Sequence, residues 1–208
     1  MTPLPRYPAD ASPDPTAYDA LVDVCGLDLT QPLLWTVPNF LAPDECRSLI
    51  SRIEAAHPTL APLSTARGPE FHPNVRNNSR VVFDDRLFAA ALFARIAPHL
   101  PRRLLRMQLC GVNERFRCYR YQPGQRFALH SDGTFARSAR ERSLLTFLVY
   151  LNDGFCGGET AFPEQGQVIV PATGTALLFQ HPLLHEGRRV ESGVKYALRS
   201  DIMYRLPQ

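Results

Sequence analysis

The amino-acid sequence predicts a mainly β protein with flanking helices, an α+β chain. Before Pro101, two stretches show the apolar period of amphipathic helices. After Pro101, short alternating segments follow one another, separated by glycine, proline and Asn-Asp-Gly turns. Such a series of short strands is typical of a barrel or sandwich. The expected strands cover residues 104–112, 115–121, 125–131, 143–151, 167–170, 175–180, 184–190 and 194–204.

The N-terminal half is expected to hold the helices and one further strand. Residues 1–15 contain five prolines and are predicted to form a flexible arm, whereas residues 16–208 are expected to form one domain. An apolar strand at 33–41 leads into a helix over about 43–56, where proline and acidic residues favour the first turn. A second helix over about 85–97 precedes a proline that stops it. The predicted apolar faces are Cys46, Leu49, Ile50 and Ile53, and Leu87, Ala90, Leu92, Phe93 and Ile96.

Polar or glycine-rich segments are expected to lie outside the strands. Residues 64–79 are predicted to form a surface loop near the mouth of a site, and residues 134–143 a mobile loop. For residues 76–80 (Arg-Asn-Asn-Ser-Arg), a solvated loop is favoured over contact with a substrate. Residues 157–160 (Gly-Gly-Glu-Thr) are interpreted as a tight turn that supports a neighbouring strand.

Composition excludes several classes of protein. With 45% hydrophobic and 21% charged residues, the chain resembles an ordinary globular protein and not a disordered or fibrous one. No stretch approaches the roughly 20 apolar residues that span a bilayer, and the start has no apolar secretory core, so we expect a cytoplasmic protein without membrane contact. A net charge of +3 is too small for a nucleic-acid footprint. The five cysteines are odd in number and far apart, which predicts free, mostly buried thiols.

A metal site is predicted at the end of the strand-like segment 126–132. His130 and Asp132 are two residues apart and therefore project from one face of a strand. Two imidazoles and one carboxylate, with positions left open, suit Fe(II) enzymes that bind O2 together with a substrate. The spacing alone is more often a solvated or hydrogen-bonded surface pair. A third ligand is required, and the candidates beside apolar strand residues are His181 and His185.

The spacing to Lys195 decides between these two histidines. Lys195 is the one lysine among 23 basic residues, and it lies ten residues beyond His185 at the start of the next apolar strand. A lysine buried there would lose hydration at a heavy cost unless an anion met it. We therefore predict His185 as the third ligand and Lys195 as the partner of a carboxylate. His181 is interpreted as a packed histidine, and the alternative for Lys195 is a surface charge at a strand end.

Five separated motifs stand in order over about residues 108–204. They are Tyr121-Gln-Pro-Gly-Gln, His130-Ser-Asp-Gly, Leu151-Asn-Asp, Gly157-Gly-Glu-Thr, and His185-Glu-Gly continuing to Gly193-x-Lys195. In order and spacing they resemble the prolyl 4-hydroxylase branch of the Fe(II)/2-oxoglutarate-dependent dioxygenase superfamily. The resemblance implies a double-stranded β-helix, or jelly-roll, core over about residues 104–204, supported by the N-terminal helices.

The same resemblance implies an activity and a set of ligands. It implies that His130, Asp132 and His185 bind iron and that Lys195 pairs with the carboxylate of 2-oxoglutarate. It further implies Fe(II), 2-oxoglutarate, O2 and ascorbate as cofactors or co-substrates. The implied reaction is hydroxylation of an organic substrate, either a prolyl residue of a protein or peptide or a small molecule, with release of succinate and CO2. The sequence indicates no oligomeric state.

Several alternatives stay open. Tyr121 and Tyr150 match positions that place hydroxyls near the co-substrate, but strand tyrosines are as often packed core residues, and Tyr119 could replace Tyr121. Arg199 shares the strand face of the lysine, either as a second carboxylate partner or, as we favour, paired with Asp201. The alternative functions are a non-catalytic jelly-roll metal-binding or sensor module and a nucleic-acid demethylase. The lysine argues against the first, and the modest net charge against the second.

Overall fold

The computed structural model describes residues 26–65 and 68–207, so the arm expected at residues 1–15 lies outside the described residues. The strands of the described part are β1 (Leu34–Val37), β2 (Thr59–Leu60), β3 (Leu63–Thr65), β4 (Gly68–Glu70), β5 (Ser79–Asp84), β6 (Arg103–Leu104), β7 (Met107–Val112), β8 (Arg115–Tyr121), β9 (Phe127–His130), β10 (Ala136–Ser138), β11 (Glu141–Tyr150), β12 (Cys156–Gly157), β13 (Thr160–Phe162), β14 (Gln167–Ile169), β15 (Ala176–Gln180), β16 (His185–Gly187), β17 (Val190–Ser192) and β18 (Lys195–Arg205).

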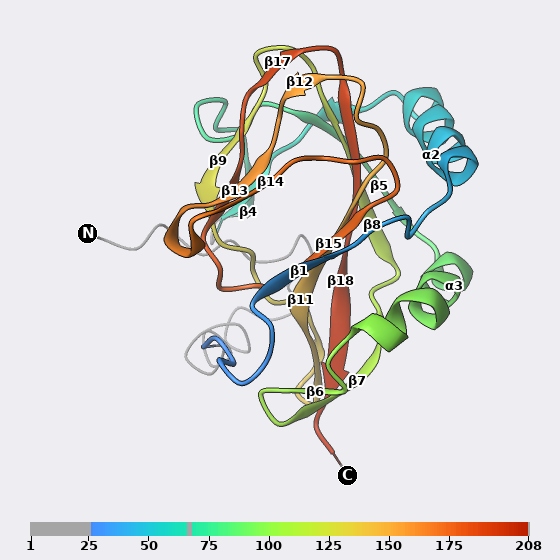
Figure 1. Cartoon of the computed structure of the whole chain (residues 1–208), viewed down its shortest axis with the longest axis vertical. Coiled ribbons are helices and arrows are strands. Elements are labelled where there is room, and N and C mark those ends of the chain that lie inside the picture. The colour runs from blue at the N-terminus through green and yellow to red at the C-terminus, as the bar shows by residue number, and fades with distance from the viewer. Residues whose placement is uncertain (1–25, 66–67, 208) are drawn as a thin grey trace.

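Most of these strands belong to a large and a small antiparallel sheet that pack against each other. The large sheet has the order β1-β15-β11-β18-β8-β5-β2, and the small sheet has the order β14-β13-β16-β9. Figure 1 shows β18 running through the middle of the molecule, with β9, β13 and β14 to one side. Phe162 of the small sheet contacts Phe179 of the large sheet, with ring centroids 5.1 Å apart. This arrangement confirms the predicted mainly β, jelly-roll class.

Strand β18 is the element that organises the large sheet around the site. It pairs with β11 on one side and with β8 on the other. In the register with β8, Lys195 lies opposite Tyr121 and Ala197 opposite Tyr119. Because side chains alternate along a strand, Lys195, Ala197 and Arg199 project from one face and Leu198 from the other. The first face looks toward the small sheet, and the second toward the helices.

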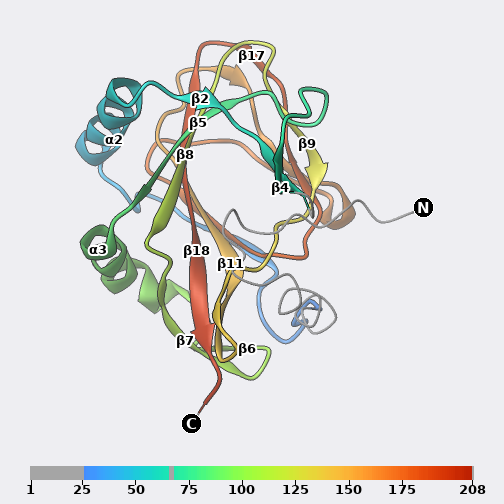
Figure 2. The same ribbon diagram turned by 180° about the vertical axis from the view of Figure 1, so that it is seen from behind.

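Helices α2 (Pro43–Ala55) and α3 (Arg86–Ile96) cover the outer face of the large sheet, and two short 3-10 turns lie at Ala97–His99 and Pro163–Gln165. Figures 1 and 2 show both helices on the side of the sheet away from β9. At the start of α2 a carboxylate oxygen of Glu45 accepts a hydrogen bond from the backbone N–H of Ala42 (2.8 Å), and at α3 the Asp85 side chain accepts one from Phe88 N–H (2.9 Å). The expected helices are therefore present, and both are capped.

The predicted apolar face of α3 is wrong at two positions. Leu87 is 86% exposed and Ala90 is also exposed, while Ala89, Leu92 and Ile96 form the buried face. Residue 87 lies two positions before Ala89, which turns its side chain about 200° around the helix axis and away from the sheet. On α2 the prediction is closer, because the buried residues are Cys46, Leu49 and Ile53.

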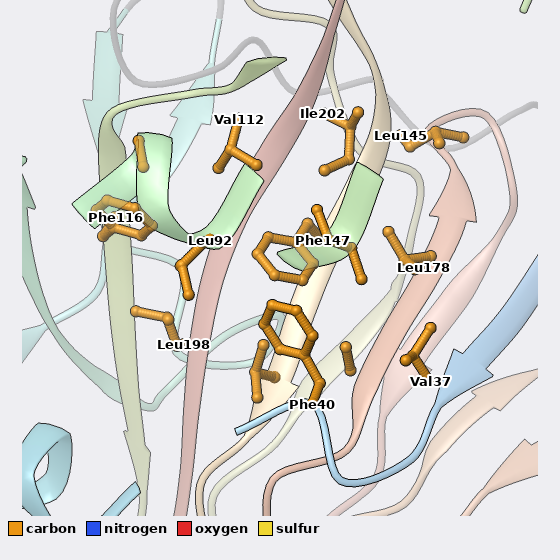
Figure 3. Close-up of a cluster of buried hydrophobic side chains, with 14 of the residues drawn as sticks. Val37, Phe40, Leu92, Val112, Phe116, Leu145, Phe147, Leu178, Leu198 and Ile202 are labelled. Atoms are coloured by element: carbon orange, nitrogen blue, oxygen red, sulfur yellow. The ribbon is translucent and has the colours of Figure 1, made fainter. Parts of the chain in front are cut away.

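The main apolar core lies between these helices and the large sheet. Figure 3 shows Leu92 of α3 near Phe116, Phe147 and Leu198, which come from three neighbouring strands. The rings of Phe40 and Phe147 meet edge to face, with centroids 5.4 Å apart. Full burial of each such side chain contributes about 1.5–3 kcal/mol. This core fixes the outer face of the sheet and leaves the inner face for polar side chains.

Several segments differ from the sequence-based prediction. Strands β5 and β13 were not predicted, and the region expected to be irregular, residues 64–79, contributes to the β3–β4 hairpin. The expected mobile loop at 134–143 contains β10, which pairs with β11. The segment 184–190 is divided between β16 and β17. The three-residue strands β3, β4, β10 and β13 are too short to show an alternating pattern, whereas the six-residue β5 pairs with β8, which is distant in the sequence.

Two expectations from composition can be compared with the described part of the chain. Its four cysteines are all free, but only Cys46 and Cys118 are buried, whereas Cys110 is half-buried and Cys156 is exposed. The prediction of mostly buried thiols is therefore wrong for the last of these, and Cys25 lies outside the described residues. Among the described residues, no helix has the length and apolar character that a membrane crossing requires.

Candidate metal and co-substrate site

The three predicted iron ligands lie together between the two sheets. His130 ends β9 and pairs in register with His185 of β16, so both imidazoles project from one face of the small sheet. Asp132 follows, with its backbone N–H donating to the carbonyl of His181 (3.0 Å). The Nε2 atoms of His130 and His185 lie 3.8 and 3.7 Å from the two carboxylate oxygens of Asp132. One ligand atom from each residue lies within 4.8 Å of the other two.

Backbone carbonyls fix the orientation of both imidazoles. His130 Nδ1 is 2.8 Å from the carbonyl oxygen of Ala128, and His185 Nδ1 is 3.0 Å from that of Leu183. A carbonyl oxygen can only accept, so each Nδ1 carries the hydrogen, and each Nε2 presents its lone pair toward Asp132. A hydrogen bond of this kind on the remote ring nitrogen is what a metal-binding histidine needs to be held in place.

Asp132 is held as a carboxylate by its surroundings. Thr146 Oγ1 donates a hydrogen bond to Oδ2 (2.5 Å), and Arg199 Nη2 lies 3.0 Å from Oδ1. Burial alone would raise the pKa of this carboxyl group, but Arg199 and the neighbouring histidines together outweigh burial and keep the pKa well below its ordinary value. Asp132 therefore stays ionised at neutral pH and can act as an anionic ligand.

Burial and aromatic rings act together on the two histidines. Burial lowers the pKa of both His130 and His185, so both are neutral at pH 7 and can donate a lone pair to a metal. Phe127 stacks on His130 with ring centroids 3.6 Å apart. Phe162 and Phe179 pack against His185 at centroid distances of 5.7 and 4.5 Å. These rings exclude water from three sides of the ligand cluster.

His181 occupies a different environment only four residues before His185. Its Nδ1 is 2.9 Å from Thr146 Oγ1 and its Nε2 is 2.8 Å from Ser143 Oγ, so both ring nitrogens have partners from the chain. Burial lowers its pKa to about 4. The imidazole of His181 thus has no free lone pair turned toward the ligand cluster, and it lies behind Thr146 rather than beside the other ligands.

Lys195 is buried on the large sheet, 4% exposed, across the cavity from the ligands. Its ammonium donates to the carbonyl oxygen of Gly158 (2.6 Å) and lies 5.3 and 5.4 Å from the ring centroids of Tyr121 and Tyr150. No carboxylate of the described residues lies within ion-pair distance of it. Burial lowers the pKa of Lys195 to about 8, although the more distant Glu159 opposes the shift. At neutral pH it is a buried cation without an anionic partner.

The ligand cluster and Lys195 line one cavity between the sheets. Its remaining walls come from strands of both sheets and combine aromatic, small and polar side chains, and Arg199 is its second cation. The lining residues are Tyr119, Tyr121, Phe127, His130, Asp132, Thr146, Leu148, Thr160, Phe179, His185, Gly187, Lys195, Ala197 and Arg199.

Comparison with known proteins agrees with this geometry. Residues 116–200 match the model of the 2OG-Fe(II) oxygenase superfamily. The matched segment holds the predicted ligands His130, Asp132 and His185 and also Lys195. A protein of Acanthamoeba polyphaga mimivirus named "Putative prolyl 4-hydroxylase" is 38% identical over 95 residues, which are 37% of this chain and 39% of that protein. The matched segment thus spans well under half the length of this curated relative. The similarity to the prolyl 4-hydroxylase branch that the motifs indicated is confirmed.

Solved structures share the fold over a longer part of the chain. The viral collagen prolyl hydroxylase of Paramecium Bursaria Chlorella virus-1, in its 2OG complex, has a TM-score of 0.59 and 24% identity, covering 84% of this chain and 97% of the other. A Pseudomonas putida prolyl-4-hydroxylase has a TM-score of 0.61 and 20% identity, with coverages of 91% and 98%. A Trichoplax adhaerens prolyl hydroxylase in complex with a hypoxia inducible factor oxygen degradation domain peptide fragment has a TM-score of 0.63 and 18% identity, with coverages of 90% and 90%.

The residues of the ligand cluster suit an Fe(II) ion. Two neutral imidazole nitrogens and one carboxylate form a three-ligand face, and the other side of the cluster opens on the cavity. Both histidines already have the second hydrogen bond that orients a ligand. His130, Asp132 and His185 would hold the metal, and the cavity between them and Lys195 would hold the co-substrate.

The two tyrosines predicted near the co-substrate differ in their hydrogen bonding. Tyr121 lines the cavity, whereas Tyr150 is not among the lining residues, although its ring centroid lies 5.4 Å from the Lys195 ammonium. Burial raises the pKa of both tyrosines. The Tyr150 hydroxyl donates to Thr160 Oγ1 (2.7 Å), as expected for a packed core tyrosine with one satisfied hydroxyl. Thr160 belongs to β13, so the interpretation of residues 157–160 as a simple turn is incomplete. Tyr119 also lines the cavity, next to Tyr121.

Sequence reasoning missed two arginine environments. Arg199 was expected to pair with Asp201, and that contact exists at 3.4 Å, but Arg199 also contacts the ligand Asp132 at 3.0 Å. Residues 76–80 were expected to form a solvated loop, yet Arg76 is only 5% exposed and Asn78 is fully buried. Because alternate residues of a strand share a face, Arg199 lies on the same face as Lys195, and this could have indicated its contact with Asp132. Nothing local indicates the second, because the partners of Arg76 are distant in the sequence.

Proposed function

We propose that the chain is an Fe(II)- and 2-oxoglutarate-dependent dioxygenase that hydroxylates an organic substrate and releases succinate and CO2. The observation that carries the proposal is the placement of His130, Asp132 and His185 in one cavity with Lys195, a buried cation that has no anionic partner among the described residues. A module that only stored or sensed a metal would have no use for such a cation beside its ligands. The match to the 2OG-Fe(II) oxygenase superfamily supports the same function.

Each group of the site has a separate task in this proposal. His130, Asp132 and His185 would bind Fe(II) on one side and leave the side toward the cavity open. Lys195 would fix the far carboxylate of 2-oxoglutarate, because its bond to the Gly158 carbonyl holds the ammonium in place. Once bound, iron and co-substrate supply the oxidative chemistry. The chain itself orients the substrate and keeps water out with the aromatic rings around the histidines.

The finer part of the proposal concerns the substrate and the reductant. The proteins of similar sequence and fold are named as prolyl hydroxylases, which favours a prolyl group as the site of hydroxylation. Because bound iron must remain Fe(II) between turnovers, ascorbate is expected to sustain the activity. The cytoplasmic location and the single domain over residues 16–208 stay predictions from the sequence.

Succinate formation tests the proposal directly. Purified protein is incubated with Fe(II), 2-oxoglutarate, O2 and proline-containing peptides, and succinate and peptide mass are measured. We expect succinate from the wild type, none from His185→Ala, and retained formation from the matched control His181→Ala. A mass gain of one oxygen on the peptide supports the prolyl substrate. If the wild type binds Fe(II) and 2-oxoglutarate yet forms no succinate with any substrate, the proposed activity is wrong.

A further inference from the structure

Arg76 is a buried cation that the proposed reaction does not use. Its backbone forms an isolated antiparallel bridge with Phe127 on β9, so residue 76 is anchored at the edge of the small sheet. Its guanidinium carbon lies 4.4 Å from the Phe127 ring centroid and 4.7 Å from that of Tyr119 on β8. The side chain therefore spans from the small sheet to the large sheet, along rings that line the cavity.

Arg76 lacks the partner that a buried charge normally has. Its Nε donates to Asn78 Oδ1 (2.8 Å), but its Nη2 atom is buried without any hydrogen-bond partner. Among residues 26–65 and 68–207, no carboxylate lies within ion-pair distance of it. Aromatic faces attract a guanidinium but cannot accept its N–H groups in the way that an oxygen anion does. A buried guanidinium in this state is costly to the folded protein unless a ligand completes it.

The hydroxyl of Tyr119 lies beside Arg76 and is acted on by Arg199 of the neighbouring strand. Its oxygen and the Nε atom of Arg199 are both buried, and neither makes a hydrogen bond of good geometry. Burial alone would raise the pKa of Tyr119, yet the charges of Arg199, Arg76 and Arg117 outweigh it and lower that pKa below its ordinary value. The space around this hydroxyl is thus strongly positive. Hydrogen-bond donors left unsatisfied in a positive region of a cavity favour an anion.

This region is separate from the place of the 2-oxoglutarate carboxylate. Lys195 lies opposite Tyr121 in the β8–β18 pair. Tyr119 lies opposite Ala197, which follows Lys195 by two residues on the same face of β18. Ala197, whose side chain is only a methyl group, lines the cavity together with Tyr119. Phe127 has the His130 imidazole stacked on one face, so Arg76 takes the other face. A small molecule held at Arg76 would therefore be separated from His130, a predicted iron ligand, by the ring of Phe127.

We propose that Arg76 and the Tyr119 hydroxyl form a subsite for a carboxylate of the primary substrate. The substrate class is then a prolyl-type compound with a free carboxylate, either a free amino-acid derivative or a peptide ending in that residue, and not the interior of a peptide chain. This inference rests on the proposed function for the reaction, but it concerns the recognition of a charge, which can be measured without turnover. A guanidinium and a hydroxyl donate to both oxygens of a carboxylate, whereas a neutral amide satisfies them poorly.

The test compares acids with their neutral amides. Protein loaded with Fe(II) and 2-oxoglutarate is kept anaerobic, and calorimetry measures the binding of acetate, L-proline, N-acetyl-L-proline and a peptide ending in proline, each beside its amide. We expect at least one of these acids to bind about tenfold or more tightly than its amide. Binding of N-acetyl-L-proline would indicate a small-molecule substrate, and binding of the peptide acid alone would indicate a chain end.

Three variants separate recognition from a structural role. Arg76→Gln should abolish the preference for the acid, and Arg76→Lys should retain part of it. Arg52→Gln is the matched control, because Arg52 also lies over an aromatic ring, Phe83, at 3.6 Å, and that ring, unlike Phe127 and Tyr119, does not line the cavity. Arg52→Gln should keep the full preference. The midpoint of denaturation of ligand-free Arg76→Gln should not fall, because the variant removes an uncompensated buried charge.

The inference is overturned if no acid binds more tightly than its amide, if the preference survives Arg76→Gln, or if Arg76→Gln lowers the denaturation midpoint of the ligand-free protein. It is also overturned if every acid competes with 2-oxoglutarate, since the anion would then occupy the Lys195 position. Because no turnover is needed, these outcomes are independent of the succinate assay. A failure of the proposed oxygenase activity would appear in that assay alone.

Discussion

The two ends of the buried polar interior along β18 differ in how their charges are paired. At the C-terminal end, Asp201 accepts from Arg117 and Asn113, both at 3.3 Å, and all three side chains are nearly inaccessible. At the N-terminal end, Lys195 is also buried, its ammonium donates to a backbone carbonyl, and no carboxylate of residues 26–65 and 68–207 lies within ion-pair distance of it. The first end uses the chain's own groups to satisfy its charges. In the proposed function, the second is completed by the carboxylate of 2-oxoglutarate.

Stability measurements on variants provide the first test of the difference between the two ends. Asp201→Asn removes a buried anion that contacts Arg117 and should lower the free energy of unfolding by about 3–5 kcal/mol. Lys195→Met removes a cation that has no anion and should leave the ligand-free protein equally stable or more stable at pH 7. Urea denaturation of the two variants and the wild type gives the comparison. Equal losses in both variants would mean that the two ends do not differ.

The pH dependence of the same measurement sharpens the contrast. The folded-state pKa of Lys195, about 8, lies below the value of about 10.4 for an unfolded lysine. The folded state therefore binds its proton less tightly, and the unfolded state binds more protons between these two values. The cost of burying the ammonium is fully present below pH 8 and should disappear as the pH rises toward about 10.4. The stability advantage of Lys195→Met over the wild type should shrink over that window.

Binding of 2-oxoglutarate should show the next largest effect. Lys195→Ala removes the charge partner but none of the metal ligands, so the concentration of 2-oxoglutarate required should rise by about two to three orders of magnitude, with iron affinity little changed. Lys195→Arg should be milder but not neutral, because a planar guanidinium needs more room than an ammonium. Succinate formation against 2-oxoglutarate concentration gives the readout. If the curve for Lys195→Ala is unchanged, Arg199 and not Lys195 binds the far carboxylate of 2-oxoglutarate.

A smaller effect is expected from pH on the same binding step. Below pH 8 Lys195 carries its charge before 2-oxoglutarate binds, whereas above pH 8 it must first gain a proton. The affinity for 2-oxoglutarate should therefore fall by about tenfold for each pH unit above 8. Lys195→Arg keeps its charge throughout and should show a flat profile. Anaerobic titrations between pH 7 and 9.5 measure both, and identical slopes would exclude Lys195 as the titrating group.

The sequence predicted the parts of the site that local spacing determines. Strand β8 has the predicted bounds, and the two-residue spacing of His130 and Asp132 placed both beside one edge of the small sheet. The spacing between His185 and Lys195 also favoured the histidine that lies with them. These features are local because strand alternation and hairpin length are properties of short segments.

The parts that the sequence did not predict depend on contacts between distant segments. Arg76 is buried because Phe127 and Tyr119, about 50 and 43 positions away, cover it, and no pattern within residues 64–79 records that. Leu87 was assigned to the wrong helix face because contacts with the sheet decide which face of α3 is buried, and that face is formed by Ala89, Leu92 and Ile96. The contact of Arg199 with Asp132 joins the two sheets and likewise needs the tertiary structure.

Metal titration of four alanine variants tests the central claim, that His130, Asp132 and His185 hold Fe(II) while His181 does not. Fe(II) affinity is measured anaerobically for the wild type and for each variant, and circular dichroism confirms that each is folded. We predict a loss of more than about a hundredfold for His130→Ala, Asp132→Ala and His185→Ala, since even losing a residue that only orients a ligand costs about 10–100-fold. His181→Ala should keep most of the affinity. Loss of iron binding in His181→Ala together with its retention in His185→Ala would contradict the account.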